Sequence, residues 1–187
     1  MRRSRATAFL LALLTVCLAG APAEKPTVRV HGNDGVLSVH GRFSVRAPRD
    51  ACWRVLVDYE HIPRFVSSVH SSHVVTRSGD RAVVEQRITT QVLFVHTTVG
   101  LTLDVREMPR HRIVFRDTSG KDFELYLGSW TLTPGALDPG TTIVDYQLEA
   151  HPRTDVPDFL GERLLEAGAA TLLDEVRGEM ARAGGAR

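Results

Sequence analysis

Eight histidines make a metal site the first chemistry to consider in this sequence. His70 and His73 are three positions apart, but they fall in a segment that we expect to be loop or strand, where this spacing points two side chains to opposite faces. The chain contains neither an HExxH pair nor paired CxxC motifs, the spacings typical of zinc ligands. We therefore predict no metal site.

The sequence also lacks the motifs that activate a serine or hold a nucleotide. It contains no GxSxG turn, no phosphate-binding glycine loop and no dinucleotide fingerprint, so we predict no cofactor. Cys52 falls on the apolar face of an expected helix with no base beside it, which favours a small buried hydrophobic residue over a nucleophile. Glu85, His96 and Tyr146 remain as side chains that could transfer a proton if they face a pocket.

Residues 1–23 are typical of a secretory signal peptide. Three arginines lie within the first five positions, an apolar run follows over 6–18, and 21–23 form a small-x-small cleavage site. The run is shorter than the ~20 residues that span a bilayer, which argues against a membrane anchor. Cys17 in LTVC leaves a lipid-attached form as an alternative, although Val16 stands where that motif has a small residue. We expect cleavage after residue 23 and a periplasmic or secreted protein.

The remaining residues, 24–187, have the length of a single domain with a hydrophobic core. Without the signal peptide the chain has 20 basic residues against 22 acidic ones, a balance that gives no indication of a nucleic-acid partner. Cys52 is then the only cysteine, which excludes an internal disulfide.

Two short helices are predicted in the stretch APRDACWRVLVDYEHIPRFV, residues 47–66. Pro48 suits the first turn of a helix, and Asp50 places negative charge near the positive end of the helix dipole. Pro63 either ends this helix or begins the next one. The apolar residues between them recur at the spacing of one helical face, at Cys52, Trp53, Leu56 and Val57.

Most of the chain after these helices alternates between apolar and polar residues, which is the pattern of half-buried strands. The stretch 95–105 alternates regularly, as does 37–45 before the helices. Within 123–132 the apolar positions move from odd to even numbers, which predicts a bulge or bend at Gly128. Glu85 and Arg87 share one face of their strand, and we interpret that face as solvated because unpaired charges are costly to bury.

A long amphipathic helix is expected at the end of the chain, capped by Asp155 and with Pro157 in its first turn. Six or seven curved antiparallel strands, two short helices after the first strand and this long helix over the sheet give an α+β domain. One helix rarely fills the space inside a strongly bent sheet, so we predict an apolar ligand pocket between them.

The run APRDACWRVLVDYEHIPRFVSSVHSS, the strands after it, the LGSW at 127–130 and the final helix resemble the START-like helix-grip superfamily. The most similar branch is the polyketide cyclase/dehydrase and coenzyme Q-binding group, and the resemblance extends from about Val28 to about Ala183. Its most specific residues are Trp53, Leu56, Asp58 and Tyr59, followed by Ile62, Pro63 and Phe65. Such relatives usually act inside cells or organelles, so the export signal argues against a polyketide substrate.

The resemblance implies a protein that holds a hydrophobic small molecule, such as a quinone, an isoprenoid or a lipid, between the sheet and the last helix. It also implies a transient contact with a membrane. No catalytic residue is implied, and a cyclase or dehydratase acting on a hydrophobic substrate in the same cavity is the alternative function. By position, the residues implied to line the cavity are Val99, Leu101, Leu103, Ile113, Phe115, Phe123, Leu125, Val144, Tyr146, Leu164 and Leu172.

Overall fold

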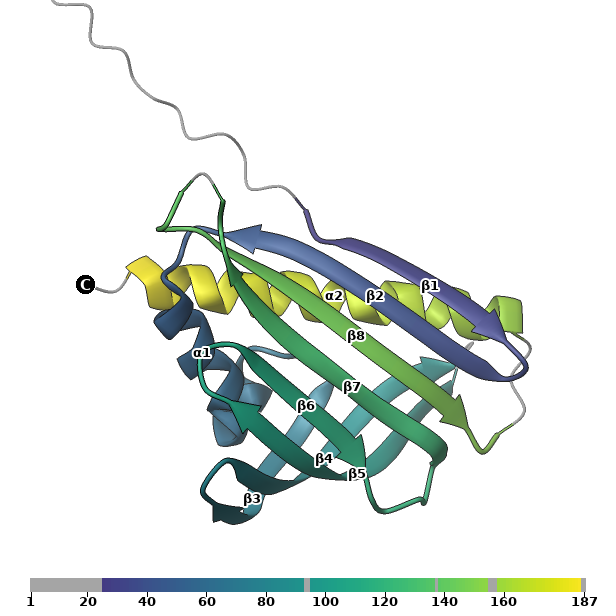
Figure 1. The fold of residues 1–187 in the computed structure, drawn as a ribbon. Helices are drawn as coiled ribbons and strands as arrows, with labels where there is room; N and C mark the ends of the chain where they lie inside the picture. The colour runs from purple at the N-terminus through teal and green to yellow at the C-terminus, as the bar shows by residue number, and fades with distance from the viewer. Residues whose placement is uncertain (1–24, 93–94, 137, 155–157, 186–187) are drawn as a thin grey trace, which may run out of the picture.

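Eight antiparallel strands form one curved sheet in the order β1-β2-β8-β7-β6-β5-β4-β3 (Figure 1). The structure is a computed structural model that describes residues 25–92, 95–136, 138–154 and 158–185. The strands are β1 Thr27–Asn33, β2 Val36–Val45, β3 Val69–Ser78, β4 Arg81–Val92, β5 Val95–Met108, β6 Arg112–Asp117, β7 Phe123–Pro134 and β8 Thr142–Pro152.

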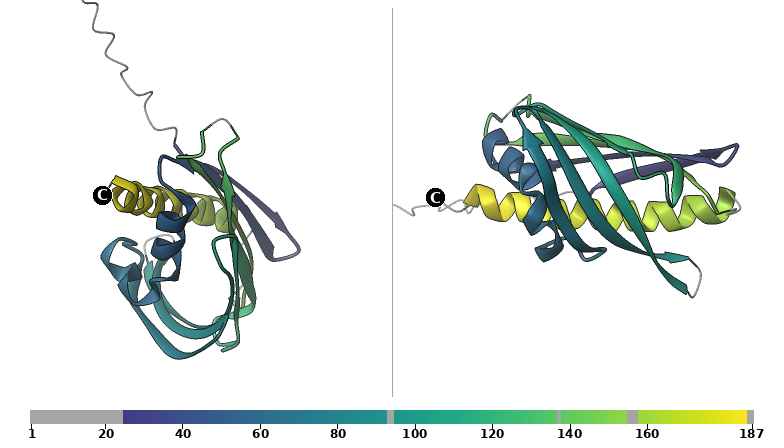
Figure 2. Two further views of the ribbon diagram at one scale, coloured as in Figure 1. Left: turned by 60° about the vertical axis from the view of Figure 1, so that its left-hand side comes forward. Right: turned by 90° about the horizontal axis from the view of Figure 1, so that it is seen from below.

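Within the described ranges, three helices complete the α+β fold. Helix α1 (Arg49–Val57) and the 3₁₀ helix η1 (Tyr59–Arg64) lie between β2 and β3, and helix α2 (Asp158–Gly185) follows β8. The sheet curls around the space that these helices close, with α2 along the β1–β2 side (Figure 2). The predicted fold class, the two short helices and the long C-terminal helix are therefore confirmed.

The sheet has eight strands where the sequence predicts six or seven. The strand hardest to predict is β1, in which only Val28 and Val30 supply the apolar alternation. It is an edge strand that pairs with β2 alone, so one side of its backbone has no neighbouring strand. A short edge strand of this kind has few apolar residues because little of it faces the core.

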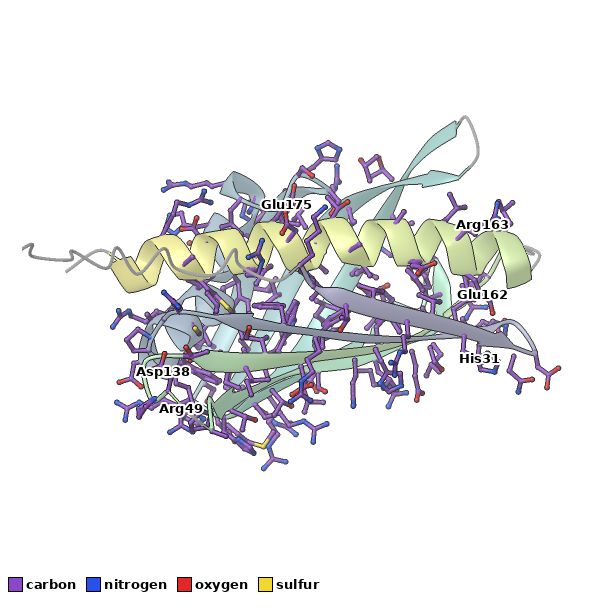
Figure 3. All side chains as sticks on the ribbon, turned by 90° about the horizontal axis from the view of Figure 1, so that it is seen from above. His31, Arg49, Asp138, Glu162, Arg163 and Glu175 are labelled. Atoms are coloured by element: carbon purple, nitrogen blue, oxygen red, sulfur yellow. The ribbon has the colours of Figure 1, made fainter. Side chains whose placement is uncertain are left out.

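Helix α2 carries two carboxylates, Glu162 and Glu175, that accept hydrogen bonds from backbone amides of β1 and of the turn before β3. Figure 3 labels both residues. Glu162 Oε1 accepts from the Gly32 amide at 2.6 Å, and Glu175 Oε2 accepts from the Ser67 amide at 3.1 Å. Asp155 and Pro157, which the sequence predicts at the start of this helix, lie outside the described residues. In the described ranges, no helix has the length and apolar character needed to cross a membrane.

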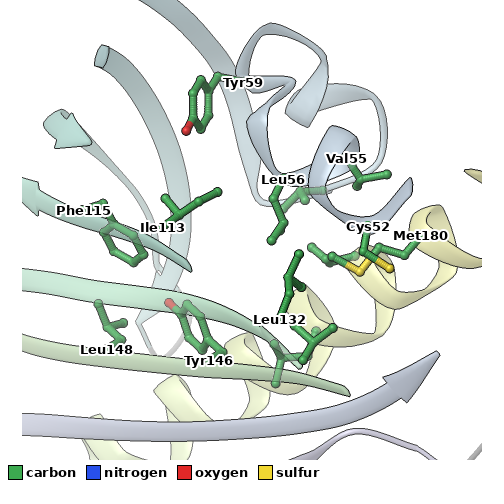
Figure 4. Close-up of a cluster of buried hydrophobic side chains, with 14 of the residues drawn as sticks. Cys52, Val55, Leu56, Tyr59, Ile113, Phe115, Leu132, Tyr146, Leu148 and Met180 are labelled. Carbon is green, nitrogen blue, oxygen red and sulfur yellow. The ribbon is translucent and has the colours of Figure 1, made fainter. Parts of the chain in front are cut away.

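The core joins α1, α2 and the sheet at one end of the molecule. Cys52 and Leu56 of α1 lie beside Met180 of α2 and Leu132 of β7 (Figure 4). The Cys52 side chain has no exposed surface, and burial raises the pKa of its thiol. The prediction that Cys52 is a buried hydrophobic residue is therefore confirmed.

Candidate functional site

One face of the sheet packs against α1 and α2, and we call it the inner face. It contains every second residue of each strand, such as Leu101, Leu103 and Val105 on β5, which are all buried. Gly41 on β2 also belongs to this face, and a methyl group on it would lie 2.3 Å from the Leu173 side chain of α2. Helix α2 therefore approaches the sheet most closely where the strand has no side chain.

The residues predicted to line a cavity lie on the inner face or on α2, with one exception. Leu164 and Leu172 on α2 are both half-buried, and Leu172 packs against the core. Their contact with a ligand stays a prediction. The predicted residues that the strands place on the inner face are Val99, Leu101, Leu103, Ile113, Phe115, Phe123, Val144 and Tyr146.

Leu125 is the exception, because it lies on the opposite, outer face. The pairing of β7 with β8 shifts by one residue between Phe123 and Leu125, and from there it is regular to the end of the strand. This bulge moves Leu125 to the outer face and Tyr126 to the inner face. The expected inner position of Leu125 is therefore wrong. The strand pairing is regular at Gly128, where the sequence predicts a bulge or a bend, so the bulge lies earlier in β7.

Five aromatic side chains gather on the inner face of β6, β7 and β8, and we call them the aromatic cluster. The Phe123 and Tyr126 rings are 4.9 Å apart between centroids, Phe115 and Tyr126 are 6.1 Å apart, and Trp130 and Tyr146 are 4.4 Å apart. All three pairs are tilted, an arrangement that aromatic rings favour. The cluster is a large and mostly apolar surface for a ligand.

The sequence alone does not identify Tyr126 or Trp130 as members of this surface. With the change of phase placed at Gly128, Tyr126 is assigned to the outer face. The residues Tyr126, Gly128, Trp130 and Leu132 nevertheless alternate without interruption, and this alternation is the signal that places the change before Tyr126.

The aromatic cluster is incompletely covered by protein. Phe123, Tyr126 and Trp130 are only half-buried, although they face the interior of the curled sheet. Burial nevertheless raises the pKa of Tyr126 to about 12, with a smaller contribution from the Asp117 carboxylate. The three rings therefore keep accessible surface on the concave side of the sheet, where a ligand could contact them.

The Tyr126 and Tyr146 hydroxyls have no hydrogen-bond partner among the described residues. In those ranges, two side-chain nitrogen atoms are fully enclosed and have no hydrogen-bond partner, namely Nε of Arg112 and Nε of Arg177. Neither tyrosine oxygen is fully enclosed in this way. The Tyr146 hydroxyl points away from the α1–α2 end of the core, toward the side of Phe115 (Figure 4). Neither hydroxyl is fully enclosed, so each can exchange hydrogen bonds with water or with a ligand.

The third tyrosine, Tyr59 of η1, is in a different situation. Its hydroxyl donates a 3.0 Å hydrogen bond to Oε1 of Glu107, whose side chain is buried on β5. The Arg77 guanidinium forms an ion pair with the same carboxylate at 3.2 Å and lies 5.4 Å from the centre of the Tyr59 ring. This cluster fastens η1 to the end of the sheet opposite β1.

We expect all three tyrosines to resist ionisation in the folded protein. Burial raises the pKa of Tyr59, Tyr126 and Tyr146, and the Glu107 carboxylate adds to the effect at Tyr59. Unfolded tyrosines lose their proton near pH ~10, so the unfolded state releases protons first and stability should fall as pH rises above that value. Tyrosinate absorbance should therefore appear only near pH 12 or together with loss of circular dichroism. A folded protein with tyrosinate signal at about pH 10 would contradict this expectation.

Two hollows open on the outer face of the sheet. The larger has a volume of about 440 Å³ and lies over β3, β4 and β5, where its lining includes Glu85, Arg87 and Lys121. The smaller, of about 120 Å³, lies over β2, β6, β7 and β8. Glu85 and Arg87 are exposed, which confirms that their face of the strand is solvated. Glu85 therefore cannot transfer a proton in a site on the inner face.

The histidines do not assemble with other metal-binding side chains in the ranges that the structure describes. No group of three or more histidine, cysteine, aspartate or glutamate residues occurs there. His70 is hydrogen-bonded to Thr89, and His73 is exposed and lies opposite Glu85 on the outer face. The side chain of His96, a candidate for proton transfer, lies outside the described part.

Comparison with known families agrees with this fold. A family model described as polyketide cyclase / dehydrase and lipid transport matches residues 45–177. The chain belongs to this family. The match begins at the end of β2 and ends within α2, so it includes both short helices, the aromatic cluster and most of the inner face. It confirms the resemblance to the START-like superfamily.

Solved structures of low sequence identity share the fold of this family member. TTHA0849 from Thermus thermophilus is 21% identical with a TM-score of 0.66, over 78% of this chain and 98% of the other. Zhui aromatase/cyclase from Streptomyces sp. R1128 is 19% identical with a TM-score of 0.64, over 79% and 94%. A STAR-related lipid transfer protein from Xanthomonas axonopodis is 18% identical with a TM-score of 0.63, over 85% and 95%. Among curated proteins, no sequence matches significantly.

Proposed function

We propose that this protein binds or transfers a hydrophobic small molecule in a cavity between the inner face of the sheet and α2. A quinone, an isoprenoid or a lipid fits an apolar surface of this kind. The observation that carries the proposal is the aromatic cluster, which faces the concave side of the sheet and keeps accessible surface. The fold similarity to a STAR-related lipid transfer protein supports it, and delivery of such a ligand would include transient contact with a membrane.

The alternative is a cyclase or dehydratase that uses the same cavity, as the fold likeness to an aromatase/cyclase suggests. Such an enzyme needs two polar groups within hydrogen-bond reach of one reacting point. Of the three residues considered for proton transfer, Glu85 is on the outer face. Tyr146 is on the inner face, but burial holds its pKa well above its ordinary value, which makes it a poor acid or base at neutral pH. The side chain of His96 is outside the described residues and is no part of this comparison. Binding without catalysis is the better-supported function.

We also propose that residues 1–23 direct export and are removed, so that the working protein is periplasmic or secreted. The support is the order of three arginines, an apolar run and a small-x-small site at the start of the chain. Ligand exchange would then take place outside the cytoplasm, where quinones and lipids are available from a membrane surface. The intact mass of the released protein tests this step, because it should correspond to a chain that starts at Glu24.

The binding proposal predicts that the protein retains a ligand when it is purified from a host that exports it. Native mass spectrometry should show one bound hydrophobic molecule per chain, and organic extraction should release it for identification. An unrelated exported protein prepared in the same way is the control for adventitious lipid. An empty protein that also takes up no hydrophobic probe would overturn the binding proposal. A released chain that keeps residues 1–23 would overturn only the cleavage proposal.

A further inference from the structure

The larger hollow on the outer face, of about 440 Å³, is within the ~300–1,000 Å³ range typical of small-molecule sites. Its lining is mostly polar and includes side chains of both charges, namely Glu85 and Arg87 on β4 and Lys121 in the loop between β6 and β7. Within the described ranges, no ion pair joins any of these three side chains to another residue. Three charged groups therefore border one hollow without neutralising one another.

The strand pairing explains why the hollow forms around Arg87. This residue lies opposite Ser71 of β3 on one side and opposite Gly100 of β5 on the other. Neither neighbour has a side chain long enough to cover a guanidinium group, and a Cβ atom at Gly100 would meet nothing within 4 Å. The exposed Arg87 side chain thus keeps donors that can bind an anionic group through two parallel hydrogen bonds.

Lys121 is placed at the rim of this hollow by a hydrogen-bonded loop. The Asp122 carboxylate accepts from the Gly100 amide at 2.9 Å, and the Asp117 carboxylate accepts from the Thr102 amide at 2.8 Å. These two contacts fasten the chain on both sides of Lys121 to β5. The backbone of residue 121 is therefore fixed beside Gly100, and it brings a second cation to the hollow.

Glu85 adds a negative charge to the lining. It is two positions from Arg87 on the same face of β4, which separates the two Cα atoms by roughly 7 Å along the strand. Its partners in the neighbouring strands are His73 and Thr102, which supply further polar groups. A purely anionic ligand would be attracted by Arg87 and Lys121 but repelled by Glu85. An ammonium group on the same ligand would replace this repulsion with an attraction.

We propose that this hollow binds a small zwitterion, with its anionic group between Arg87 and Lys121 and its ammonium group beside Glu85. The site is independent of the proposed cavity, because its charged strand residues are on the other face of the sheet. It also takes a different class of ligand, since a hydrophobic molecule would have to remove these charges from water without pairing them. Phosphoethanolamine is the probe that fits this description, because a two-carbon chain joins its phosphate to its ammonium group.

Three matched probes test the site, namely phosphoethanolamine, inorganic phosphate and ethanolamine. In an NMR titration that follows backbone amides, the Gly100 and Thr102 signals should shift with phosphoethanolamine, and its Kd should be roughly tenfold lower than that of either part. Arg87→Ala should raise this Kd about tenfold. Glu85→Gln keeps the shape of the side chain and removes its charge, so it should weaken the binding of phosphoethanolamine and strengthen that of phosphate.

Arg116→Ala is the matched control, because Arg116 is an exposed arginine on the outer face that lines neither hollow. This variant should bind phosphoethanolamine as the unaltered protein does, and the amide spectra show whether each variant is folded. Equal affinity for the three probes, or equal effects of Arg87→Ala and Arg116→Ala, would overturn the site and leave the proposed cavity standing.

A zwitterion of this kind can be a soluble molecule or the head group of a membrane lipid, and vesicles of phosphatidylethanolamine and phosphatidylcholine distinguish the two sources. Sedimentation of the protein with these vesicles that is lost in Arg87→Ala would assign the site to a lipid head group. Binding of free phosphoethanolamine without sedimentation would assign it to a soluble zwitterion. Failure to bind either form would overturn the site.

Discussion

Replacing Gly128 with valine is expected to destabilise the protein by about 3 kcal/mol, the upper end of the usual cost of overpacking a core. A Cβ atom at this position would lie 2.4 Å from the backbone oxygen of Gln147 and 2.5 Å from Cζ of Phe115. The oxygen belongs to the β7–β8 pairing and the Phe115 ring is buried, so neither can move away cheaply. Urea unfolding followed by circular dichroism measures the loss.

Gly100→Val is the matched control for this substitution. Gly100 also lies within a strand, but a Cβ atom there would meet nothing within 4 Å because it points into the larger outer hollow. Valine favours the strand conformation more than glycine does, so we expect a change between zero and a gain of about 0.5 kcal/mol. Equal losses of stability at the two positions would mean that contact with Phe115 and Gln147 does not determine the size of the side chain that position 128 tolerates.

The Gly128 position also shows how one glycine shapes the candidate site. Phe115 lies over the gap that Gly128 leaves on the neighbouring strand, and from there its ring reaches Tyr126. A side chain at residue 128 would push this ring into the aromatic cluster. The glycine is therefore part of the shape of the site, although the sequence alone suggests a bulge.

The general fold could be predicted because it follows from local patterns. Alternation along residues 37–45 and 95–105 shows which side of each strand is apolar, and the two prolines at Pro48 and Pro63 mark the short helices. Inner-face positions such as Leu103 and Tyr146 follow from the same period. The first strand gives a weaker signal, limited to Val28 and Val30, because its edge position demands few apolar residues.

The composition of the site could be predicted only in part, because it depends on strand register. A shift of one residue before Leu125 exchanges the two faces of β7, and its sign in the sequence is the alternation that runs from Tyr126 to Leu132, which is easily assigned to the wrong face. The same shift decides that Tyr126 faces inward and can join Tyr146. Which hydroxyls are paired depends on contacts far apart in the chain, such as that between Tyr59 and Glu107, which no local pattern contains.

Replacing Glu107 with alanine is expected to cost about 3 kcal/mol, because it removes the acceptor of a buried donor and one partner of an ion pair. The Glu107 side chain is buried and accepts from Tyr59, which is itself 6% exposed, so the Tyr59 hydroxyl would be left without a partner. Loss of the ion pair should cost less than loss of the hydrogen bond, because the Arg77 side chain is 43% exposed and water can solvate its charge. Chemical denaturation again measures the change in the free energy of unfolding.

A double-mutant cycle separates the unpaired hydroxyl from the other losses at Glu107. In a Tyr59→Phe background no donor is left unsatisfied, so Glu107→Ala should cost about half as much as it does alone. Glu124→Ala is the control for loss of a carboxylate, because Glu124 is 52% exposed in its ion pairs with His151 and Arg153 and should change stability by less than about 0.5 kcal/mol. If Glu107→Ala costs the same with and without the Tyr59 hydroxyl, that hydrogen bond does not hold η1 against the sheet. The stability would then come from the packing of Tyr59 and the surrounding apolar side chains alone.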